Sequence, residues 1–274
     1  MIWGTTWSVI QIGLQGIPPF TGVAIRFAIA GALLLGIALA RGIRLGQSRR
    51  ERRLWWFNGL FGFAVAYGVV YWAEQWVPSG LAAVLFAVYP LIVAVLAHFF
   101  LTSERLHPRE TVGVLLGFTG VGVIFLEDFA ALGGPQVAVG AAVMLLSPLA
   151  AGAASVYIKR WGQGIHPFSI AAVPMLIAAG TAAILALVLE RGAGITWDRT
   201  SVLALLYLSI VGSALTFSLY FWLLSLLPAK RLALIAYVIP VVAVGIGALR
   251  GEPFTLHVLA GSVVVVFGVA LASR

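Results

Sequence analysis

Long apolar runs, each about as long as the ~20 residues that span a bilayer core as a helix, constrain this chain more than any other feature. Only 9% of the residues are charged and 62% are hydrophobic, whereas a soluble domain has about a quarter charged. Polar and apolar residues do not alternate along the runs, as they would in a membrane β-barrel. The sequence therefore predicts an all-α membrane protein that crosses the bilayer several times.

Charged residues and Gly/Pro breaks divide the chain into ten predicted transmembrane helices. They cover residues 1–15, 18–41, 54–76, 78–101, 108–126, 136–159, 167–189, 201–225, 228–249 and 254–273. The first segment has neither a basic region nor a small-residue cleavage site, so we expect no cleavable signal peptide. It is short for a span, and we expect the natural helix to begin before residue 1.

The basic residues gather on one side of this predicted topology. If the N-terminus is cytoplasmic, 13 of the 17 Lys and Arg residues fall at the cytoplasmic side, and only Arg191, Arg199 and Arg250 fall outside. This positive-inside pattern predicts that both termini are cytoplasmic. The net charge of +8 then reflects topology, and we expect no nucleic-acid partner. The absence of cysteine excludes disulfides and Cys-ligated zinc.

Motifs of the first half recur in the second at an offset of 148 or 150 residues. GIPPF (16–20) matches GIHPF (164–168) at an offset of 148. At an offset of 150, Trp72 matches Trp222, Pro78 matches Pro228 and Pro90 matches Pro240. At an offset of 148, Glu104 matches Glu252, Gly113 matches Gly261 and Gly120 matches Gly268. Each half has five predicted helices, so the second half enters the membrane from the opposite side. We expect two inverted-topology five-helix repeats, 1–130 and 131–274, an arrangement typical of secondary transporters. A duplication kept only for stability is the alternative.

Two prolines lie in the middle of apolar runs, Pro90 in LFAVYPLIVAVL (85–96) and Pro240 in AYVIPVVAV (236–244). Each removes a backbone hydrogen bond and bends its helix. In a bilayer the freed carbonyl needs a protein or water partner, and paired interruptions are typical of a midplane substrate site. With Pro148 in the sixth segment, they predict kinks at a gated central site. Curvature for packing alone is the alternative.

Several of these motifs resemble EamA-type permeases of the drug/metabolite transporter (DMT) superfamily. In the first half they are WGTTW (3–7), Arg26-Phe27, YWAEQWVPSG (71–80), Tyr89-Pro90 and SERL (103–106), and in the second Pro228, Pro240 and GEPF (251–254). GEPF departs from SERL, which leaves the role of the second motif open. The resemblance implies two inverted five-helix repeats that move small metabolites. Amino-acid exporters of the YddG type are plausible relatives among members with diverse substrates.

Polar and aromatic side chains at half-depth predict a substrate cavity between the repeats. Tyr67 and Tyr71 share a helix face, as do Ser213, Thr216 and Tyr220. The predicted cavity residues are Thr5, Thr6, Trp7, Tyr67, Tyr71, Tyr89, Ser147, Ser155, Ser213, Thr216, Tyr220 and Tyr237. They would suit a zwitterion or a neutral amphipathic molecule. For each residue the alternative is a hydrogen bond between helices.

Arg26 and Glu74 are the charges predicted inside the membrane. An intramembrane arginine needs a carboxylate or carbonyl partner. Glu74 lies at a compatible depth, and the carboxylate of a substrate is the rival partner. We favour a structural clamp for Arg26, because it belongs to a motif found in members with different substrates. Because Glu74 is an acid that can carry a proton, the sequence does not decide whether transport is coupled to protons.

These features together predict a transporter that exports small metabolites, amino acids first, by alternating access through a bacterial inner membrane. Other organic metabolites or drugs are the alternative cargo. The chain shows no nucleophile with a base, no metal-binding histidine spacing and no phosphate-binding loop, so an enzyme is disfavoured. A channel is disfavoured too, because the halves do not resemble a symmetric pore subunit. We expect no cofactor or metal, with substrate and bilayer as partners and a monomer compatible with the sequence.

Overall fold

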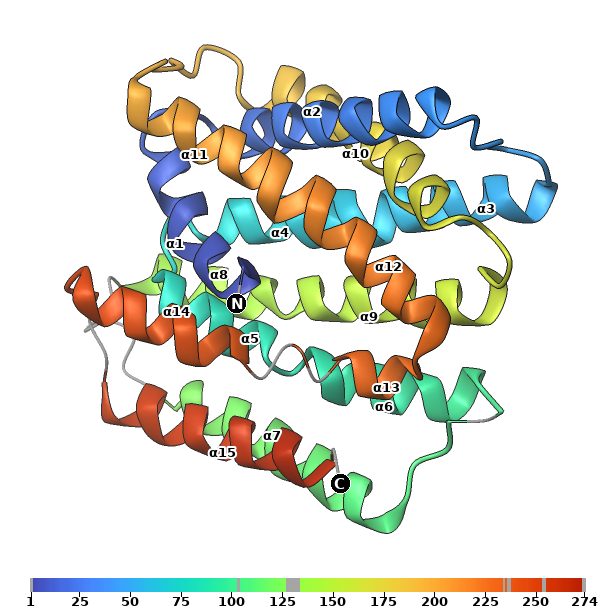
Figure 1. Ribbon diagram of the computed structural model, residues 1–274. Coiled ribbons are helices and arrows are strands. Elements are labelled where there is room, and N and C mark those ends of the chain that lie inside the picture. Colours follow the sequence, from blue (N-terminus) through green and yellow to red (C-terminus); the bar gives the residue numbers. More distant parts are fainter. Residues whose placement is uncertain are drawn as a thin grey trace.

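The computed structural model describes residues 2–102, 104–126, 134–233, 235, 238–252 and 255–272. Across those residues the regular structure is helical, and the helices lie side by side in a bundle (Figure 1). Large apolar side chains cover the outside, as at Leu187, which is 72% exposed, and Phe267, which is 61% exposed. A continuous apolar exterior of this kind is stable in lipid rather than in water.

In the described residues, the first half of the chain contains seven α-helices and one π-helix. They are α1 (Ile2–Leu14), α2 (Pro19–Ala40), α3 (Arg49–Phe57), the π-helix η1 (Asn58–Val65), α4 (Ala66–Ala73), α5 (Ser79–Phe86), α6 (Tyr89–Phe100) and α7 (Pro108–Ile124). The segment from α3 to α4 is one continuous helix. It begins five residues before the predicted start at 54, because Ser48 caps its N-terminus by accepting the Glu51 N–H.

The described part of the second half also contains a π-helix between two α-helices. Its helices are α8 (Pro135–Met144), α9 (Leu146–Trp161), α10 (Pro167–Leu189), α11 (Arg199–Ser209), the π-helix η3 (Ile210–Leu215), α12 (Thr216–Leu226), α13 (Ala229–Ala233), α14 (Val238–Leu249) and α15 (Leu256–Ala272). Asp198 caps α11 by accepting the backbone N–H groups of Ser201 and Thr200. Those hydrogen bonds, the Ser201 ones first, hold the pKa of Asp198 below its ordinary value.

Within the part of the chain that the structure describes, six helical segments are long and apolar enough to cross a bilayer. They are Pro19–Ala40, Arg49–Ala73, Ser79–Phe100, Pro135–Trp161, Pro167–Leu189 and Arg199–Leu226. The other predicted spans contain shorter helices in the described residues, such as the 13 residues of α1 and the 17 of α7 and α15. The protein is therefore an integral membrane protein that crosses the bilayer several times.

The described helices are interrupted next to prolines that the sequence analysis singled out. Ala87 and Val88 form a turn between α5 and α6, and Pro90 is the second residue of α6. Leu145 separates α8 from α9, and Pro148 is the third residue of α9. Each break precedes its proline because the missing N–H leaves the preceding turn without a hydrogen bond. Pro240 is the third residue of α14.

Two glutamates from opposite halves each hold the start of a short helix in the other half. Glu104 accepts the first two backbone N–H groups of α13, at 3.0 Å each. Glu252 accepts Ser79 Oγ–H at 2.5 Å and the Gly80 N–H at 2.9 Å, at the start of α5. A carboxylate is favourable there, because helix N-termini carry unpaired N–H groups and partial positive charge. We call these the Glu104 contact and the Glu252 contact.

Glutamates also join the paired helices α2 and α10, which lie together at the top of Figure 1. Glu190, after α10, accepts the Phe20 N–H at 2.6 Å and the Thr21 N–H at 2.9 Å at the start of α2. At the opposite end Ser169, near the start of α10, donates to Glu51. Each half is therefore tied to the other at both ends of the bundle.

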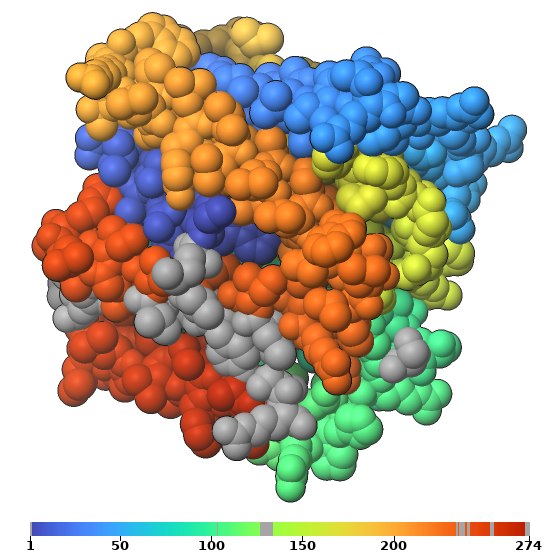
Figure 2. All heavy atoms as spheres, viewed as in Figure 1, coloured from blue at the N-terminus to red at the C-terminus, as the bar shows by residue number. Residues whose placement is uncertain are grey.

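Small residues bring α7 and α15 together at the bottom of Figure 1. A Cβ on Gly268 would lie 2.4 Å from the Gly117 N and 2.6 Å from the Gly113 O, and one on Gly120 would lie 2.6 Å from the Val265 N. The two backbones are in direct contact, as small-xxx-small patterns allow. Figure 2 shows a second contact between distant segments, where α11 (orange) lies against α1 and α2 (blue).

Candidate functional site

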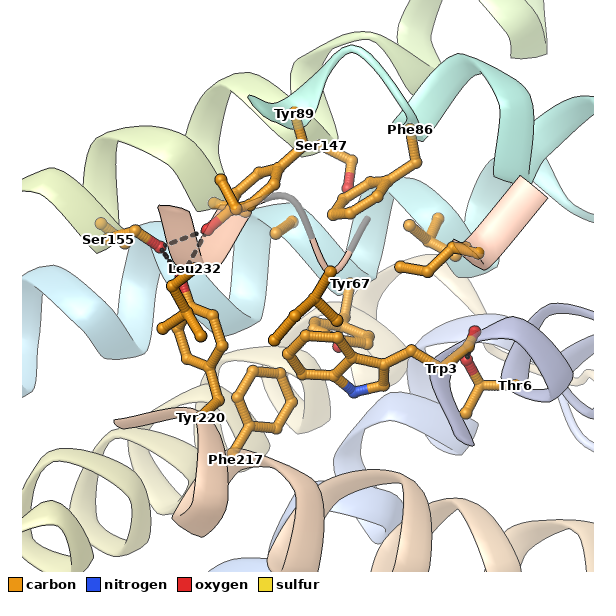
Figure 3. Close-up of a pocket in the computed structure, with 18 of the residues that line it drawn as sticks. Trp3, Thr6, Tyr67, Phe86, Tyr89, Ser147, Ser155, Phe217, Tyr220 and Leu232 are labelled. Carbon is orange, nitrogen blue, oxygen red and sulfur yellow. Dashed lines mark hydrogen bonds between the residues drawn. The ribbon is translucent and has the colours of Figure 1, made fainter. Parts of the chain in front are cut away.

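A cavity of about 80 Å³ lies at the centre of the bundle (Figure 3). It has room for roughly five to eight water molecules at 10–15 Å³ each. Eight aromatic rings line it: Trp3, Trp7, Tyr67, Phe86, Tyr89, Phe217, Tyr220 and Phe221. No charged side chain is among the lining residues in the part of the chain that the structure describes. The cavity therefore has an uncharged, largely aromatic lining in the described residues.

Three hydroxyl groups form a closed triangle on one wall of the cavity, drawn with dashed lines in Figure 3. Tyr89 OH lies 2.8 Å from Ser155 Oγ and 2.6 Å from Tyr220 OH, and Tyr220 OH lies 3.0 Å from Ser155 Oγ. The three residues come from α6, α9 and α12, so the triangle joins the two halves of the chain. Because these hydroxyls satisfy one another, their main role is to hold the wall in place.

Other polar groups at the cavity have no partner. Ser147 Oγ and Trp7 Nε1 are buried, belong to lining residues, and make no hydrogen bond in the structure. Trp3 Nε1 is likewise a buried atom of a lining residue and makes no hydrogen bond in the structure. A buried polar group left unpaired costs about 1–3 kcal/mol, a cost that a bound ligand can remove. Ser147, Trp7 and Trp3 are therefore lining residues that each carry a polar atom without a partner.

The predicted cavity residues divide into two groups. Seven line the cavity: Thr6, Trp7, Tyr67, Tyr89, Ser147, Ser155 and Tyr220. The other four described residues are not among the lining residues: Thr5, Tyr71, Ser213 and Thr216. Thr5 forms a hydrogen bond with Tyr207 OH at 2.7 Å, and Tyr71 and Ser213 accept hydrogen bonds from Arg26. Thr216 Oγ1 is buried and has no hydrogen-bond partner. Tyr237 lies outside the described residues.

The prediction that Ser213, Thr216 and Tyr220 share one cavity face is wrong. It assumed 3.6 residues per turn, but the π-helix η3 ends at Leu215, just before Thr216, and has a wider turn. Only Tyr220 of the three lines the cavity, while Ser213 turns toward Arg26.

Sequence reasoning missed several lining residues. Trp3, Phe86, Phe217 and Phe221 supply half of the aromatic rings, and Asn58 lines the wall while donating to Ile170 O at 2.8 Å. Phe217 and Phe221 are spaced i, i+4, next to the chosen Tyr220, and this spacing could have revealed them. The search for polar groups passed over purely apolar rings.

Arg26 is fully buried at 0% exposure, and neutral groups hold it. Its Nε donates to Ser213 Oγ at 2.8 Å, and its other nitrogens donate to Gly212 O at 3.3 Å and Tyr71 OH at 3.4 Å. The guanidinium carbon lies 4.7 Å from the centre of the Tyr67 ring, a cation–π contact.

The hypothesis that Glu74 pairs with Arg26 is wrong, because the two form no ion pair within the described residues. The π-helix η3 brings a backbone carbonyl and a serine hydroxyl to the arginine instead. Glu74 itself is 3% exposed, and neither carboxyl oxygen has a hydrogen-bond partner.

An apolar helix bundle around a central uncharged cavity is the architecture of a membrane transporter. The chain belongs to the EamA-like transporter family, whose profile matches residues 1–126 and 138–274. The resemblance seen in the sequence is thus confirmed, and the protein is a transporter rather than an enzyme.

Relatives of this chain are also named as transporters. The chain is 32% identical to the uncharacterised inner membrane transporter YedA of Escherichia coli strain K12, covering all of this chain and 87% of the relative. It is 24% identical to the uncharacterised transporter YoaV of Bacillus subtilis strain 168, covering 98% and 92%. A crystal structure of a protein 22% identical in sequence has the same fold, with a TM-score of 0.74 over 99% of this chain and 92% of the other.

Proposed function

We propose that the protein is a secondary transporter that exports small metabolites, with amino acids as its cargo, as exporters of the YddG type do. The observation that carries this proposal is the central cavity, which is buried, uncharged and aromatic, and has unpartnered polar groups at Ser147 and Trp7. Such a site binds a small solute and releases it again, since no strong ion pair holds the solute there.

The groups around the cavity match the parts of an amino acid. Indole N–H and serine hydroxyl groups donate to a carboxylate, and aromatic faces attract an ammonium group. The apolar wall receives a side chain. A cationic drug would favour an acidic residue, and the described lining has none. Neutral organic metabolites are the alternative cargo, because they need only the hydroxyl and aromatic contacts.

We further propose ten membrane spans in two inverted repeats, 1–130 and 131–274, with both termini in the cytoplasm. Three observations support the repeats: the family profile matches twice, a π-helix occurs in each half at η1 and η3, and the Glu104 and Glu252 contacts are reciprocal. The basic loop residues support the orientation. The name of the YedA relative supports a bacterial inner membrane.

Transport would proceed by alternating access around the cavity. The Glu104 contact and the Glu252 contact join the halves at opposite ends of the bundle, on the proposed cytoplasmic and outer sides respectively. Both contacts are present in this structure. Breaking one contact while keeping the other would open the cavity to one side only, with the breaks at Pro90 and Pro148 allowing the helices to move.

Reconstituted vesicles test this proposal. The purified chain is placed in liposomes loaded with radiolabelled amino acids, and release is followed for the wild type, Ala154→Phe and Ala28→Phe. Ala154 lines the cavity, whereas Ala28 is exposed on the outside of α2 and serves as the matched control. We expect saturable release that Ala154→Phe abolishes and Ala28→Phe preserves.

Two results would contradict the proposal. If the wild type releases no amino acid, the cargo assignment fails, and neutral metabolites are tested in the same vesicles. If Ala154→Phe, folded by its thermal melt, transports as fast as the wild type, the central cavity is not the route.

A further inference from the structure

Glu74 is a carboxyl group without a hydrogen-bond partner in the interior of the bundle. It follows the last residue of α4, is 3% exposed, and neither of its oxygens accepts or donates a hydrogen bond. An ionised carboxylate in such a place is expensive, whereas the protonated acid is far less so. The geometry therefore requires a proton on Glu74 in the conformation described here.

The neighbouring charges do not supply a partner. Arg26 on α2, Tyr71 on α4, and Arg250 and Glu252 after α14 are close enough to act on Glu74 electrostatically. Arg26 and Tyr71 bond each other, Arg250 donates to Ser8 O at 3.2 Å, and Glu252 holds the start of α5.

The helices that pack on α4 add no nearer partner. Helix α8 has no titratable residue, and the titratable residues of α9, which are Tyr157, Lys159 and Arg160, lie at its far, proposed cytoplasmic end. Glu252 is also close enough to act on Glu74, and it has the same sign when both are ionised.

We propose that Glu74 is a proton-binding site that controls the Glu252 contact. With the proton bound, Glu74 is neutral and the Glu252 contact stays closed. When the carboxylic acid releases its proton to water on the outer side, the new carboxylate repels Glu252 and requires hydration, and the contact opens. Transport by this protein is then coupled to protons.

This inference rests on the proposed alternating access but on no particular cargo. Its tests use no cargo at all, so a failed transport assay and a failed proton site give separate results. Lack of amino-acid release leaves the proton site to be judged on the readouts below.

The first test detects the proton directly. Infrared spectra of the full chain in phosphatidylcholine vesicles at neutral pH are compared in water and heavy water. We expect a carboxylic-acid carbonyl band that shifts in heavy water for the wild type and for Glu110→Gln, and that disappears in Glu74→Gln. Glu110 is the matched control, because it already pairs with Lys230 at 2.8 Å.

Glu74→Asp serves as a second variant, since it keeps the acid and should keep a band at a changed frequency. A band that is unchanged in Glu74→Gln, or absent from the wild type, overturns the proposal.

The second test follows the Glu252 contact. The natural chain has no cysteine, so Ala82→Cys, one turn into α5 and fully buried, gives a single label site. Every thiol reacts faster with maleimide as the pH rises, because the thiolate is the nucleophile, so each rate is divided by that of free glutathione at the same pH. We expect this relative rate with a membrane-impermeant maleimide to rise severalfold from mildly acidic to mildly alkaline pH. Adding Glu74→Gln should keep the relative rate low throughout, and adding Glu110→Gln should change nothing. The same acceleration with Glu74→Gln as without it overturns the link between the proton and the contact.

Discussion

Arg26 shows how a buried charge is held at the scale of one residue. Its guanidinium has several N–H donors in one plane, and the site supplies a hydroxyl, a carbonyl and a phenol to them, with the Tyr67 ring against its face. This arrangement fits arginine and no other cation, because lysine offers a point charge without the planar fork. The site is a structural clamp beside the cavity wall that Tyr67 forms.

Arg26→Lys is therefore expected to destabilise the fold. Hydrogen bonds to charged groups contribute about 1.5–3 kcal/mol each, and the lysine loses at least the Nε bond to Ser213. We expect a loss of about 2 kcal/mol in the free energy of unfolding, seen as a lower melting temperature in detergent. Arg191→Lys, at an exposed arginine after α10, is the control and should melt like the wild type. Equal melting of the two variants would contradict the clamp.

Ser147 and Ser155 are two cavity serines with opposite expectations. Ser155 bonds two tyrosine hydroxyls, so Ser155→Ala should lower the free energy of unfolding by about 1–2 kcal/mol. Ser147 has no partner, so Ser147→Ala should leave stability unchanged or raise it slightly, yet weaken substrate affinity by about twofold to tenfold. Thermal melts and the KM of transport measure the two effects. A destabilised Ser147→Ala with unchanged KM would assign this serine to packing.

For single residues, the sequence predicted which kinds of side chain line the cavity better than it predicted which groups they bond. Tyr67, Tyr89 and Tyr220 were chosen for their depth and polarity, and all three line the cavity. Glu74 was a candidate partner of Arg26, beside a carbonyl or a substrate carboxylate, on depth alone, and depth does not tell which face of a helix a residue takes. That choice depends on packing between helices, which one sequence does not show.

At the scale of elements, the π-helices explain why the residues predicted to share one cavity face do not all line the cavity. Helical spacing assumes a constant turn, and η1 and η3 change that turn in the middle of the helices that line the cavity. No sequence pattern of local propensity marks them, because they form where tertiary packing favours the extra residue. Helix ends were predicted better, since Pro, Gly and charged residues set them locally.

The contact between α7 and α15 gives a prediction at this scale. Gly268→Ala would place a Cβ against the backbone of α7, where no rotamer change can relieve it, so we expect a loss of about 1–3 kcal/mol in stability. Gly122→Ala is the matched control on α7 itself, because a Cβ there meets nothing within 4 Å. Melting temperatures in detergent compare the two. The packing account fails if Gly122→Ala destabilises as much as Gly268→Ala.

At the scale of the whole molecule, the two halves exchange equivalent contacts. Glu104 and Glu252 are 148 residues apart, and each holds a helix start in the other half, 150 residues apart. The sequence showed the matched positions but not their use, because the partners are backbone N–H groups that leave no signature in the side chains. The GEPF motif, whose role the sequence left open, contains Glu252 and so acquires a role in joining the halves.

These reciprocal contacts predict opposite effects of equivalent substitutions. Glu252→Gln weakens the contact at α5 and Glu104→Gln the contact at α13, each by about 1.5–3 kcal/mol if one charged hydrogen bond is lost. A change of 1.4 kcal/mol shifts an equilibrium tenfold, so each variant should favour opening at its own end by about tenfold or more.

Single cysteines at Ala82 and Leu232, the fourth residues of α5 and α13, report the two ends through maleimide labelling in detergent. Both are buried in this structure. We expect Glu252→Gln to accelerate labelling at 82 and not at 232, and Glu104→Gln to do the reverse, because opening one end requires the other contact to stay closed. Acceleration at both sites in either variant would mean general loosening of the bundle, and would contradict alternating access through these contacts.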